Sequence, residues 1–320
     1  MTVALVNEHM VRFYGSKNLR EWTKLSDFGP AGSTRNGWEC PSLIPLPVNG
    51  DLHHIKYVLF VSLFGDHGPA MQYFVGDFDG KTFKNLNSAD KVFRVDHGDS
   101  FYAAIAWRDA PQDKKILLGW LINGKPETYP WKGQMSIPRD LSLRTTGEGI
   151  RLFQNPTTII NNRLAKLSNG TPFIRNNMPL KGMVPLSNAN RFNKNAYWIE
   201  ADIQPGKSAK TGFVIAENKN YSKMIMVGYD RDKQELYVDC SKSEHGRKDT
   251  TNLVQTAPLK PSNGIIKLWV LVDRSSLEVF GNGGEQVIST MIYPDNDATA
   301  LSAFSTPGSV IKTLKIWDMD

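Results

Sequence analysis

Cysteine is scarce in this chain, and long apolar runs are missing. Only Cys40 and Cys240 occur among 320 residues, too few and too far apart in sequence for a disulfide framework or a zinc site. No stretch approaches the ~20 apolar residues that a membrane-spanning helix needs. Residues 1–9 carry neither the basic segment nor the cleavage site of a signal peptide. The residues therefore predict no membrane association and leave the compartment open.

Concentrated positive charge is also lacking. The chain has 38 Lys and Arg against 32 Asp and Glu, a net charge of +6, but the basic residues are scattered along it. Nucleic-acid-binding proteins normally gather basic residues on one face or along one helix. No nucleic-acid partner is predicted, and the charge is expected to bear mainly on solubility.

Amphipathic helices of three turns are not evident anywhere. Short apolar or alternating runs of strand length recur instead. Between them, dipeptides such as Asp79-Gly80, Asn123-Gly124 and Asn263-Gly264 are of the kind that closes tight turns. Many short strands with frequent turns are typical of a β-sandwich, barrel or propeller. The sequence predicts an all-β protein.

The length favours two domains, because a single core usually stops growing at about 250–300 residues. The strand pattern loosens between Asn155 and Asn195 into a stretch containing many Asn, Pro and Ser residues. We place the boundary at its start, which gives domains of residues 1–155 and 156–320. The first domain places Trp, Glu, Asp and Tyr at strand ends, so any chemistry is expected there.

Glu39, in the segment Trp38-Glu39-Cys40-Pro41, is the first candidate for chemistry. Cleaving a glycosidic bond usually takes two carboxyl groups, one that protonates the leaving oxygen and one that attacks the anomeric carbon or activates water. Because Glu39 lies between an aromatic and a small apolar residue, we expect a shielded environment that favours a proton donor. The alternative is an ordinary solvated glutamate.

The segment around Glu39 is one of several motifs that occur in order along the chain. They are Ser16 to Thr23, Trp38 to Pro41, Gln72 to Gly80, Phe101-Tyr102-Ala103, Trp131 to Arg139 and Val272 to Phe280. Together they resemble glycoside hydrolase family 32, the β-fructosidases, which include invertases, inulinases and levanases. The resemblance covers nearly the whole chain. It implies a β-propeller of five blades followed by a β-sandwich, and hydrolysis of sucrose or fructans with retention, without a metal or cofactor.

The resemblance also implies roles for single residues. Glu39 matches the general acid/base, and Trp131 resembles the aromatic residue that lines the fructose pocket. Asp96 and Tyr102 match the stretch that borders the acid, and with Trp38 they are expected to contact substrate. The alternatives are a core tryptophan at Trp131 and turn or packing roles at Asp96 and Tyr102.

Two motifs of the family are missing from this sequence. One is Trp-x-Asn-Asp-Pro-Asn-Gly, which holds the nucleophile, and the other is Arg-Asp-Pro, which holds a transition-state stabiliser. Arg108-Asp109-Ala110-Pro111 is only superficially similar, because it follows Phe101-Tyr102-Ala103. Residues 1–6 read as the middle of a strand. We expect upstream sequence to be missing and residues 1–155 to form about three propeller blades. The alternative is an N-terminal strand that is tightly docked.

We therefore expect a β-fructosidase that by itself is weakly active or inactive on sucrose, inulin or levan. The alternative is a non-catalytic fructan-binding protein. Open propeller edges are expected to promote self-association, because unpaired strands invite pairing. If upstream sequence is missing, the family implies a secreted or periplasmic location.

Overall fold

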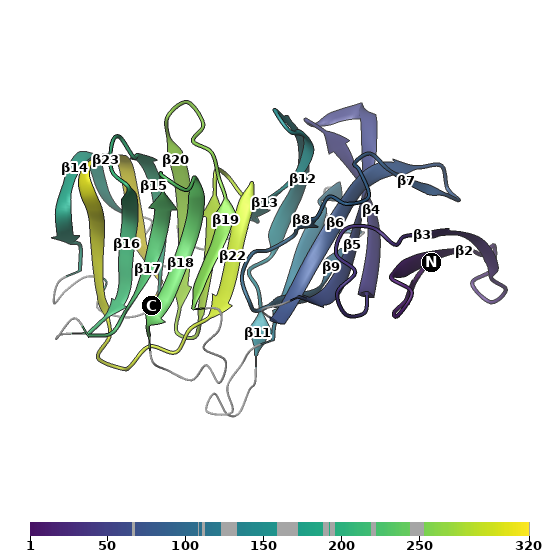
Figure 1. Ribbon diagram of the computed structural model, residues 1–320, viewed down its shortest axis with the longest axis horizontal. Helices are drawn as coiled ribbons and strands as arrows, with labels where there is room; N and C mark the ends of the chain where they lie inside the picture. The colour runs from purple at the N-terminus through teal and green to yellow at the C-terminus, as the bar shows by residue number, and fades with distance from the viewer. Residues whose placement is uncertain are drawn as a thin grey trace. The chain divides into compact units, whose positions relative to one another are not determined.

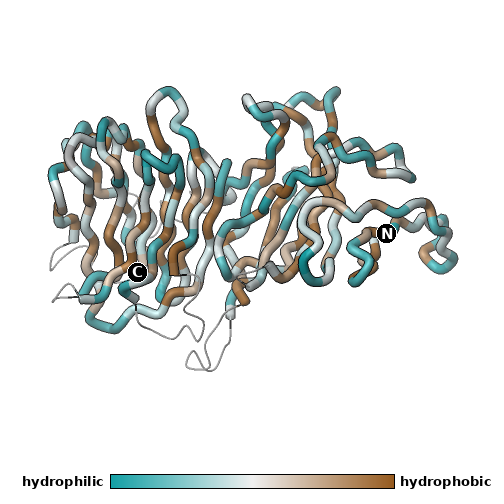
Figure 2. Tube along the Cα trace, in the orientation of Figure 1, coloured by the Kyte–Doolittle hydropathy of each residue, from teal (hydrophilic) through white to brown (hydrophobic). Residues whose placement is uncertain are grey.

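The structure is a computed structural model that describes residues 1–65, 68–107, 109–110, 113–122, 133–158, 172–187, 192, 196–218, 222–243 and 253–319. The chain divides into two compact units, residues 1–156 and 157–320. Both are built from β-strands joined by turns (Figure 1). The prediction of an all-β protein is confirmed. Apolar residues run along the strands, and hydrophilic residues gather at the turns (Figure 2).

The first unit contains two sheets. One has three strands in the order β1-β2-β3, and the other has ten strands. In the larger sheet, β4 to β7 form one antiparallel group and β9, β10, β12 and β13 form another. A parallel bridge between Leu143 and Val48 joins the two groups. Each group of four antiparallel strands has the composition of a propeller blade.

These strands have the following bounds: β1 (Thr2–Leu5), β2 (Met10–Gly15), β3 (Thr23–Phe28), β4 (Glu39–Val48), β5 (Asp51–Gly65), β6 (Gly68–Phe78), β7 (Phe83–Asn85), β8 (Phe93–Arg94), β9 (Phe101–Trp107), β10 (Ile116–Leu121), β11 (Gln134–Met135), β12 (Arg139–Thr146) and β13 (Gly149–Pro156). The two-residue strand β8 pairs with β6, and β11 pairs with β10.

The core of the first unit is explained by the composition of its middle strands. Residues 58–62 of β5 are almost continuously apolar and have no exposed surface, as expected for a strand that is covered on both faces. Trp38, Phe74 and Phe13 belong to the apolar cluster that includes this strand. The site described below lies where these buried strands reach the surface.

The second unit is one ten-stranded antiparallel sheet that folds over into two layers. Its strand order is β19-β18-β17-β16-β23-β15-β20-β21-β22, with β14 paired to β23, and the end strands β19 and β22 contact each other. The strands are β14 (Phe173–Pro185), β15 (Tyr197–Gln204), β16 (Lys210–Glu217), β17 (Met224–Asp230), β18 (Glu235–Lys242), β19 (Val254–Pro258), β20 (Ile266–Asp273), β21 (Ser276–Gly281), β22 (Gln286–Met291) and β23 (Ala300–Asp318).

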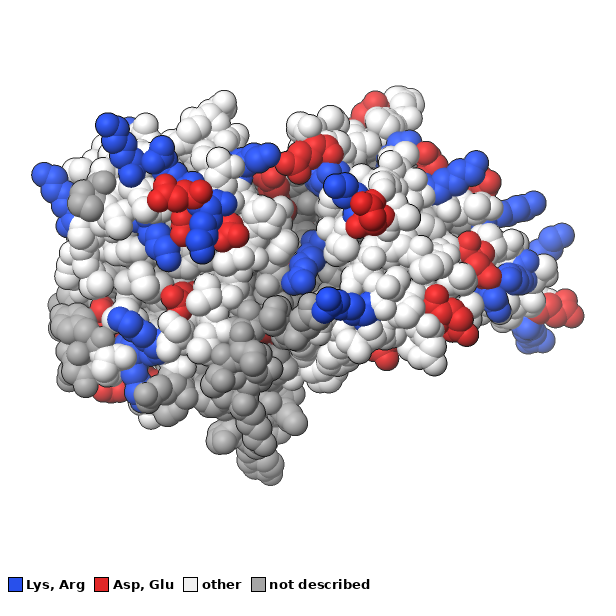
Figure 3. Space-filling model, viewed as in Figure 1, with Lys and Arg blue, Asp and Glu red and all other residues white. Residues whose placement is uncertain are grey.

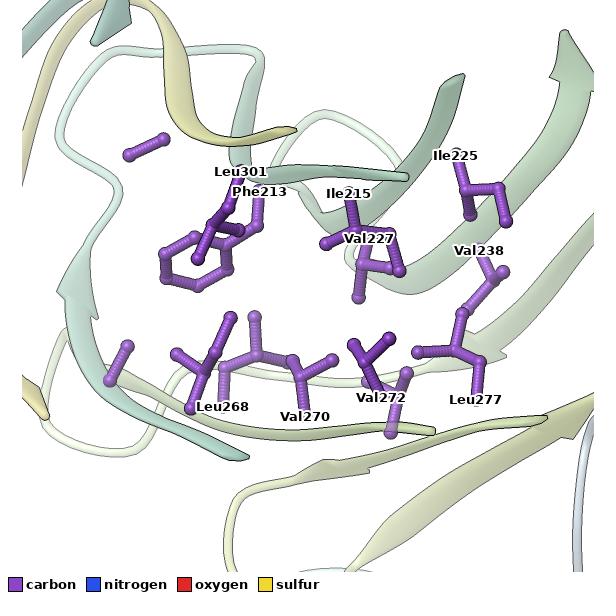
Figure 4. Close-up of a cluster of buried hydrophobic side chains, with 14 of the residues drawn as sticks. Phe213, Ile215, Ile225, Val227, Val238, Leu268, Val270, Val272, Leu277 and Leu301 are labelled. Carbon is purple, nitrogen blue, oxygen red and sulfur yellow. The ribbon is translucent and has the colours of Figure 1, made fainter. Parts of the chain in front are cut away.

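The core of the second unit forms because buried residues alternate with more exposed ones along its strands. In β20, Leu268, Val270 and Val272 are fully buried, while the residues between them are more exposed. Across the core they face Phe213 and Val227 of the other layer (Figure 4). Two layers that bury alternate residues between them make a β-sandwich.

On the face that Figure 3 shows, charges of both signs occur in each unit, and Lys and Arg are interspersed with Asp and Glu. None of the described residues forms a helix with the length and apolar character to cross a membrane. Within the same described ranges, no three His, Cys, Asp or Glu side chains are grouped as metal ligands would be.

The sandwich core supports a matched test of stability. Ile288→Ala removes a side chain without exposed surface, so we expect the free energy of unfolding to fall by about 2–5 kcal/mol. Ile174→Ala removes the same atoms from an exposed site in the same unit, and surface changes usually stay within about 0.5 kcal/mol. Urea denaturation followed by circular dichroism measures both. Equal losses of unfolding free energy in the two variants would contradict the assignment of Ile288 to the core.

Candidate active site

Glu39 is the first residue of β4, at the point where the chain leaves the core. The preceding Trp38 has no exposed surface, whereas the Glu39 side chain is exposed. The expectation of a shielded carboxyl was therefore wrong. Successive residues of an extended chain point to opposite faces, so a buried aromatic neighbour does not bury the glutamate that follows it.

A β-bulge sets the direction of Glu39. The pairing of β4 with β5 shifts register between Glu39, which lies opposite Ser62, and Ser42. Within this irregularity Cys40 has a φ of 46°, in the left-handed region that non-glycine residues seldom adopt. Bulges of this kind re-aim side chains and are frequent beside active sites. Burial, followed by the charge of Glu39, raises the pKa of the Cys40 thiol, which therefore remains protonated at neutral pH.

Tyr102 is brought to Glu39 by a second irregularity. It lies in β9, which contacts β4, and its hydroxyl donates a hydrogen bond to Oε2 of Glu39. The next residue, Ala103, has a φ of 49°, and the pairing of β9 with β10 shifts register here. Burial, then the hydrogen bond to Glu39, raises the pKa of Tyr102 well above its usual value. The hydroxyl therefore stays protonated and remains a donor.

The exposed ring of Phe64 packs beside Tyr102, the hydrogen-bond partner of Glu39. Its ring lies 5.0 Å from the Tyr102 ring, measured between centroids, and is tilted by 49°. The Phe64 side chain is exposed, unlike that of Tyr102. An exposed aromatic ring beside an exposed carboxyl is a surface on which a sugar ring can pack.

Asp96 is buried in an ion pair beneath the site. Its Oδ2 lies 3.0 Å from Nη1 of Arg139, and neither side chain is more than 1% exposed. The other oxygen accepts a hydrogen bond of 2.8 Å from the amide of Gly98. A carboxylate that is satisfied in this way and shielded from solvent has a structural role in the described chain. The alternative of a turn or packing role, rather than direct substrate contact, is the one that this geometry favours.

The Arg139 guanidinium connects several elements. Its Nη1 also donates to Oε1 of Gln154 at 3.1 Å, and the group lies 4.1 Å from the centre of the Phe101 ring. Gln154 in turn donates to the carbonyl of Val95 at 2.5 Å. These hydrogen bonds connect the segment before Tyr102, which contains Val95 and Asp96, to strands β12 and β13.

Trp38 supports the site from the core. Its indole N–H donates to the carbonyl of Ser33 at 2.8 Å, and its ring lies 5.6 Å from that of Phe74. Because the Trp38 side chain has no exposed surface, its position favours a packing role, and its contact with substrate stays a prediction. Trp131, the other predicted aromatic, lies outside the described residues.

The sequence analysis predicted no role for Arg139, Gln154 or Phe64, although Arg139 ends one of its motifs. Arg139 had a usable signal, because it occupies an inward position of β12 together with Leu141 and Leu143. A charged residue in an apolar alternation indicates a buried pair. Phe64 and Gln154 had no comparable signal, since an apolar or polar residue within a strand is common in any sheet.

Comparison with known families identifies both units. Residues 1–156 match the model described as "Glycosyl hydrolases family 32 N-terminal domain", and residues 166–318 match "Glycosyl hydrolases family 32 C terminal". A levanase of Bacillus subtilis is 40% identical over 327 residues, which cover 96% of this chain and 46% of the levanase. An extracellular exo-inulinase of Aspergillus awamori is 32% identical, with 97% of this chain and 59% of the inulinase covered.

A solved structure shows the same architecture. The crystal structure of exo-inulinase from Aspergillus awamori matches with a TM-score of 0.86 and 29% identity, over 100% of this chain and 64% of that one. The expected β-propeller followed by a β-sandwich is confirmed, while the number of blades stays a prediction. The chain spans about half the length of the curated relatives that it matches.

The buried ion pair gives a test within this site. Arg139→Gln leaves the Asp96 carboxylate buried without its cation, so we expect a loss of about 3–5 kcal/mol in the free energy of unfolding. Lys56→Gln is the control, because it removes a partly exposed pair with Asp77 at 2.7 Å, which is worth about 0–1 kcal/mol. Chemical denaturation measures both variants. A small loss for Arg139→Gln would contradict the proposed network.

Proposed function

Because the chain belongs to glycosyl hydrolase family 32, we propose that its first unit carries the acid/base of an enzyme that releases fructose from fructans or sucrose. Glu39 is that acid/base. The observation that carries the proposal is the position of its carboxylate, which is exposed at a β-bulge and held by the Tyr102 hydroxyl. The levanase and exo-inulinase relatives support fructose polymers as the substrate class.

The geometry suits a group that alternately donates and accepts a proton. Tyr102 donates to Oε2, so Oε1 is the oxygen that would carry the proton to the glycosidic oxygen of the leaving group. In a retaining hydrolysis the same residue then takes a proton from the water that releases the sugar. Tyr102 keeps its own proton because of its raised pKa, and its role is to orient the carboxylate.

The second carboxylate of a retaining pair must lie ~5–5.5 Å from the acid/base. Asp96 does not fit this role, because its charge is engaged by buried Arg139. The sequence contains no Trp-x-Asn-Asp-Pro-Asn-Gly motif. We therefore propose that these 320 residues by themselves are weakly active or inactive, since removing one member of a catalytic unit costs many orders of magnitude in rate.

Fructan binding without turnover is the second candidate. The exposed ring of Phe64 beside Tyr102 and Glu39 favours it, because these groups form a sugar-contacting surface whether or not a nucleophile is present. Trp131 is proposed as a further contact with the fructose ring. An extracellular location belongs to the same proposal and is supported by the exo-inulinases that are described as extracellular.

We expect the purified 320-residue chain to release fructose from sucrose, inulin and levan at a negligible rate. A coupled fructose assay and calorimetric titration with the same three compounds measure turnover and binding separately. Fructan binding without product would favour a binding role for the isolated chain. Clear fructose release that Glu39→Gln abolishes would overturn the expected inactivity and show that another carboxylate serves as nucleophile.

Self-association is proposed through an apolar sheet face. Ile105, Trp107, Trp120 and Met135 are each about half exposed, between 42% and 54%. Trp120 lies opposite Met135 in the strand pairing, and Ile105 lies opposite Leu118, two residues before Trp120. Residues paired in this way share one face of a sheet. Contiguous exposed apolar patches on soluble proteins mark interaction sites.

The expected result is a concentration-dependent rise in the sedimentation coefficient of the chain. Ile105→Lys should shift the equilibrium towards the monomer, because it places a charge within the apolar face. Leu52→Lys also replaces an exposed apolar side chain by lysine, at a residue of β5 that is 77% exposed, and it should leave the association unchanged. A chain that is monomeric at all concentrations would contradict the proposal.

A further inference from the structure

The loop before β4 carries Asn36, whose side chain reaches the neighbouring strand β5. Its amide nitrogen donates a hydrogen bond to the backbone carbonyl of Phe64. Phe64 is the last residue but one of β5, and its partner in β6 is Pro69, which has no N–H to donate. The end of β5 therefore receives a hydrogen bond from a residue outside its pairing with β6.

The backbone conformation at Asn36 explains why asparagine suits this position. Its φ is 54°, in the left-handed region, which asparagine tolerates better than most residues. Asparagine also has a side-chain N–H donor, which glycine lacks. Both properties are used here, because the same residue bends the chain and donates to Phe64.

The loop itself is anchored to the turn between β1 and β2. The Trp38 amide donates to the carbonyl of Val6 at 3.1 Å, and Nε2 of His9 donates to the carbonyl of Asn36 at 2.6 Å. The His9 ring also packs edge-on against the Trp38 indole, with the centroids 6.3 Å apart. The amide that contacts Phe64 is therefore held in place before any ligand binds, which lowers the entropic cost of binding.

Phe64 lies on the same face of the sheet as the acid. Glu39 is opposite Ser62 in the pairing of β4 with β5, and Phe64 follows two residues later along β5. Residues two apart in a strand point to the same face, and diagonal neighbours on paired strands lie roughly 7–8 Å apart, within reach of an aromatic side chain. The Phe64 ring accordingly packs on Tyr102, whose hydroxyl holds Oε2 of Glu39.

The position of the Phe64 ring indicates which part of a substrate it would contact. In a retaining hydrolysis the fructosyl unit lies between the nucleophile and the acid, and the acid protonates the oxygen of the leaving group. The leaving sugar therefore lies beside Glu39, on the side away from the nucleophile. Phe64 is 41% exposed, whereas Tyr102 beneath it is buried, so the Phe64 ring is accessible to a sugar that approaches from solvent.

We propose that Phe64 is a specificity-determining residue against which the leaving sugar packs, and that Asn36 is the residue that positions it. This inference rests on the proposed acid/base role of Glu39. A phenyl ring offers an apolar face without a hydrogen-bond donor or acceptor. It therefore recognises a ring-shaped leaving group by its C–H face and not by its pattern of hydroxyl groups. Glucosyl and fructosyl leaving groups are both accepted, whereas an alkyl leaving group gains little from the contact.

NMR titration of the full 320-residue chain tests this inference without requiring turnover. Sucrose and 1-kestose carry a sugar as the leaving group, whereas methyl β-fructofuranoside carries only a methoxy group. An aromatic contact of this kind is worth about three- to tenfold in affinity. We therefore expect sucrose and 1-kestose to bind more tightly than the methyl fructoside by about that factor.

Variants of Phe64 assign this preference to the ring. Phe64→Ala should lower the affinities for sucrose and 1-kestose about three- to tenfold and leave the affinity for methyl fructoside unchanged. Phe64→Trp retains a flat apolar face and should keep the preference. Trp22→Ala is the control, because it removes an exposed aromatic ring from the segment between β2 and β3, and it should leave all three affinities unchanged.

Asn36→Gly tests the positioning role. Glycine adopts a left-handed φ without strain, so this variant keeps the bend and loses the amide that donates to Phe64. We expect sucrose to bind about two- to tenfold more weakly, the scale of one hydrogen bond, and methyl fructoside to bind as before. Asn282→Gly is the matched control, because Asn282 has a φ of 50° and donates to the carbonyl of Lys260 in the second unit. Thermal melts establish that each variant is folded.

The outcomes separate this inference from the proposed function. Equal affinities of the unchanged chain for sucrose and methyl fructoside would overturn the inference and leave the proposed function intact, as would a preference that survives Phe64→Ala. Losses in Asn36→Gly that extend to methyl fructoside, or that Asn282→Gly shares, would overturn the positioning role of Asn36. A chain that binds no fructoside at all would contradict the proposed function as well.

Discussion

The buried ion pair between Asp96 and Arg139 is the interaction on which the arrangement of the site depends. It joins the segment before β9 to the start of β12, and Gln154 extends it to β13. Desolvating two charges is expensive, and the attraction offsets that cost only where the remaining hydrogen bonds are also made. Here the amide of Gly98 and the side chain of Gln154 supply such bonds. The pair therefore fixes where β9 begins and with it the position of Tyr102.

Two β-bulges, one in β4 and one in β9, then orient Glu39 and Tyr102 towards each other. Regular pairing would continue the in-and-out alternation of β4 and β9. The left-handed residues Cys40 and Ala103 interrupt it directly after Glu39 and Tyr102. Non-glycine residues in this conformation cost about 1–3 kcal/mol each and persist only where the surroundings impose them. One such residue follows Glu39 and the other follows Tyr102, so the surrounding packing imposes the backbone conformation that brings these two side chains together.

Much of the fold was accessible from the sequence, because alternation, turn dipeptides and the absence of amphipathic helices depend on local chemistry. The ordered motifs also led to Glu39 and Tyr102. The contact between Glu39 and Tyr102 was not accessible in this way, since it depends on a bulge opposite Ser62 and on the approach of β9, which lies far away in the sequence. Asp96 was placed near the acid, but its partner Arg139 lies 43 residues away in the sequence. Long-range pairings of this kind leave only weak local signals.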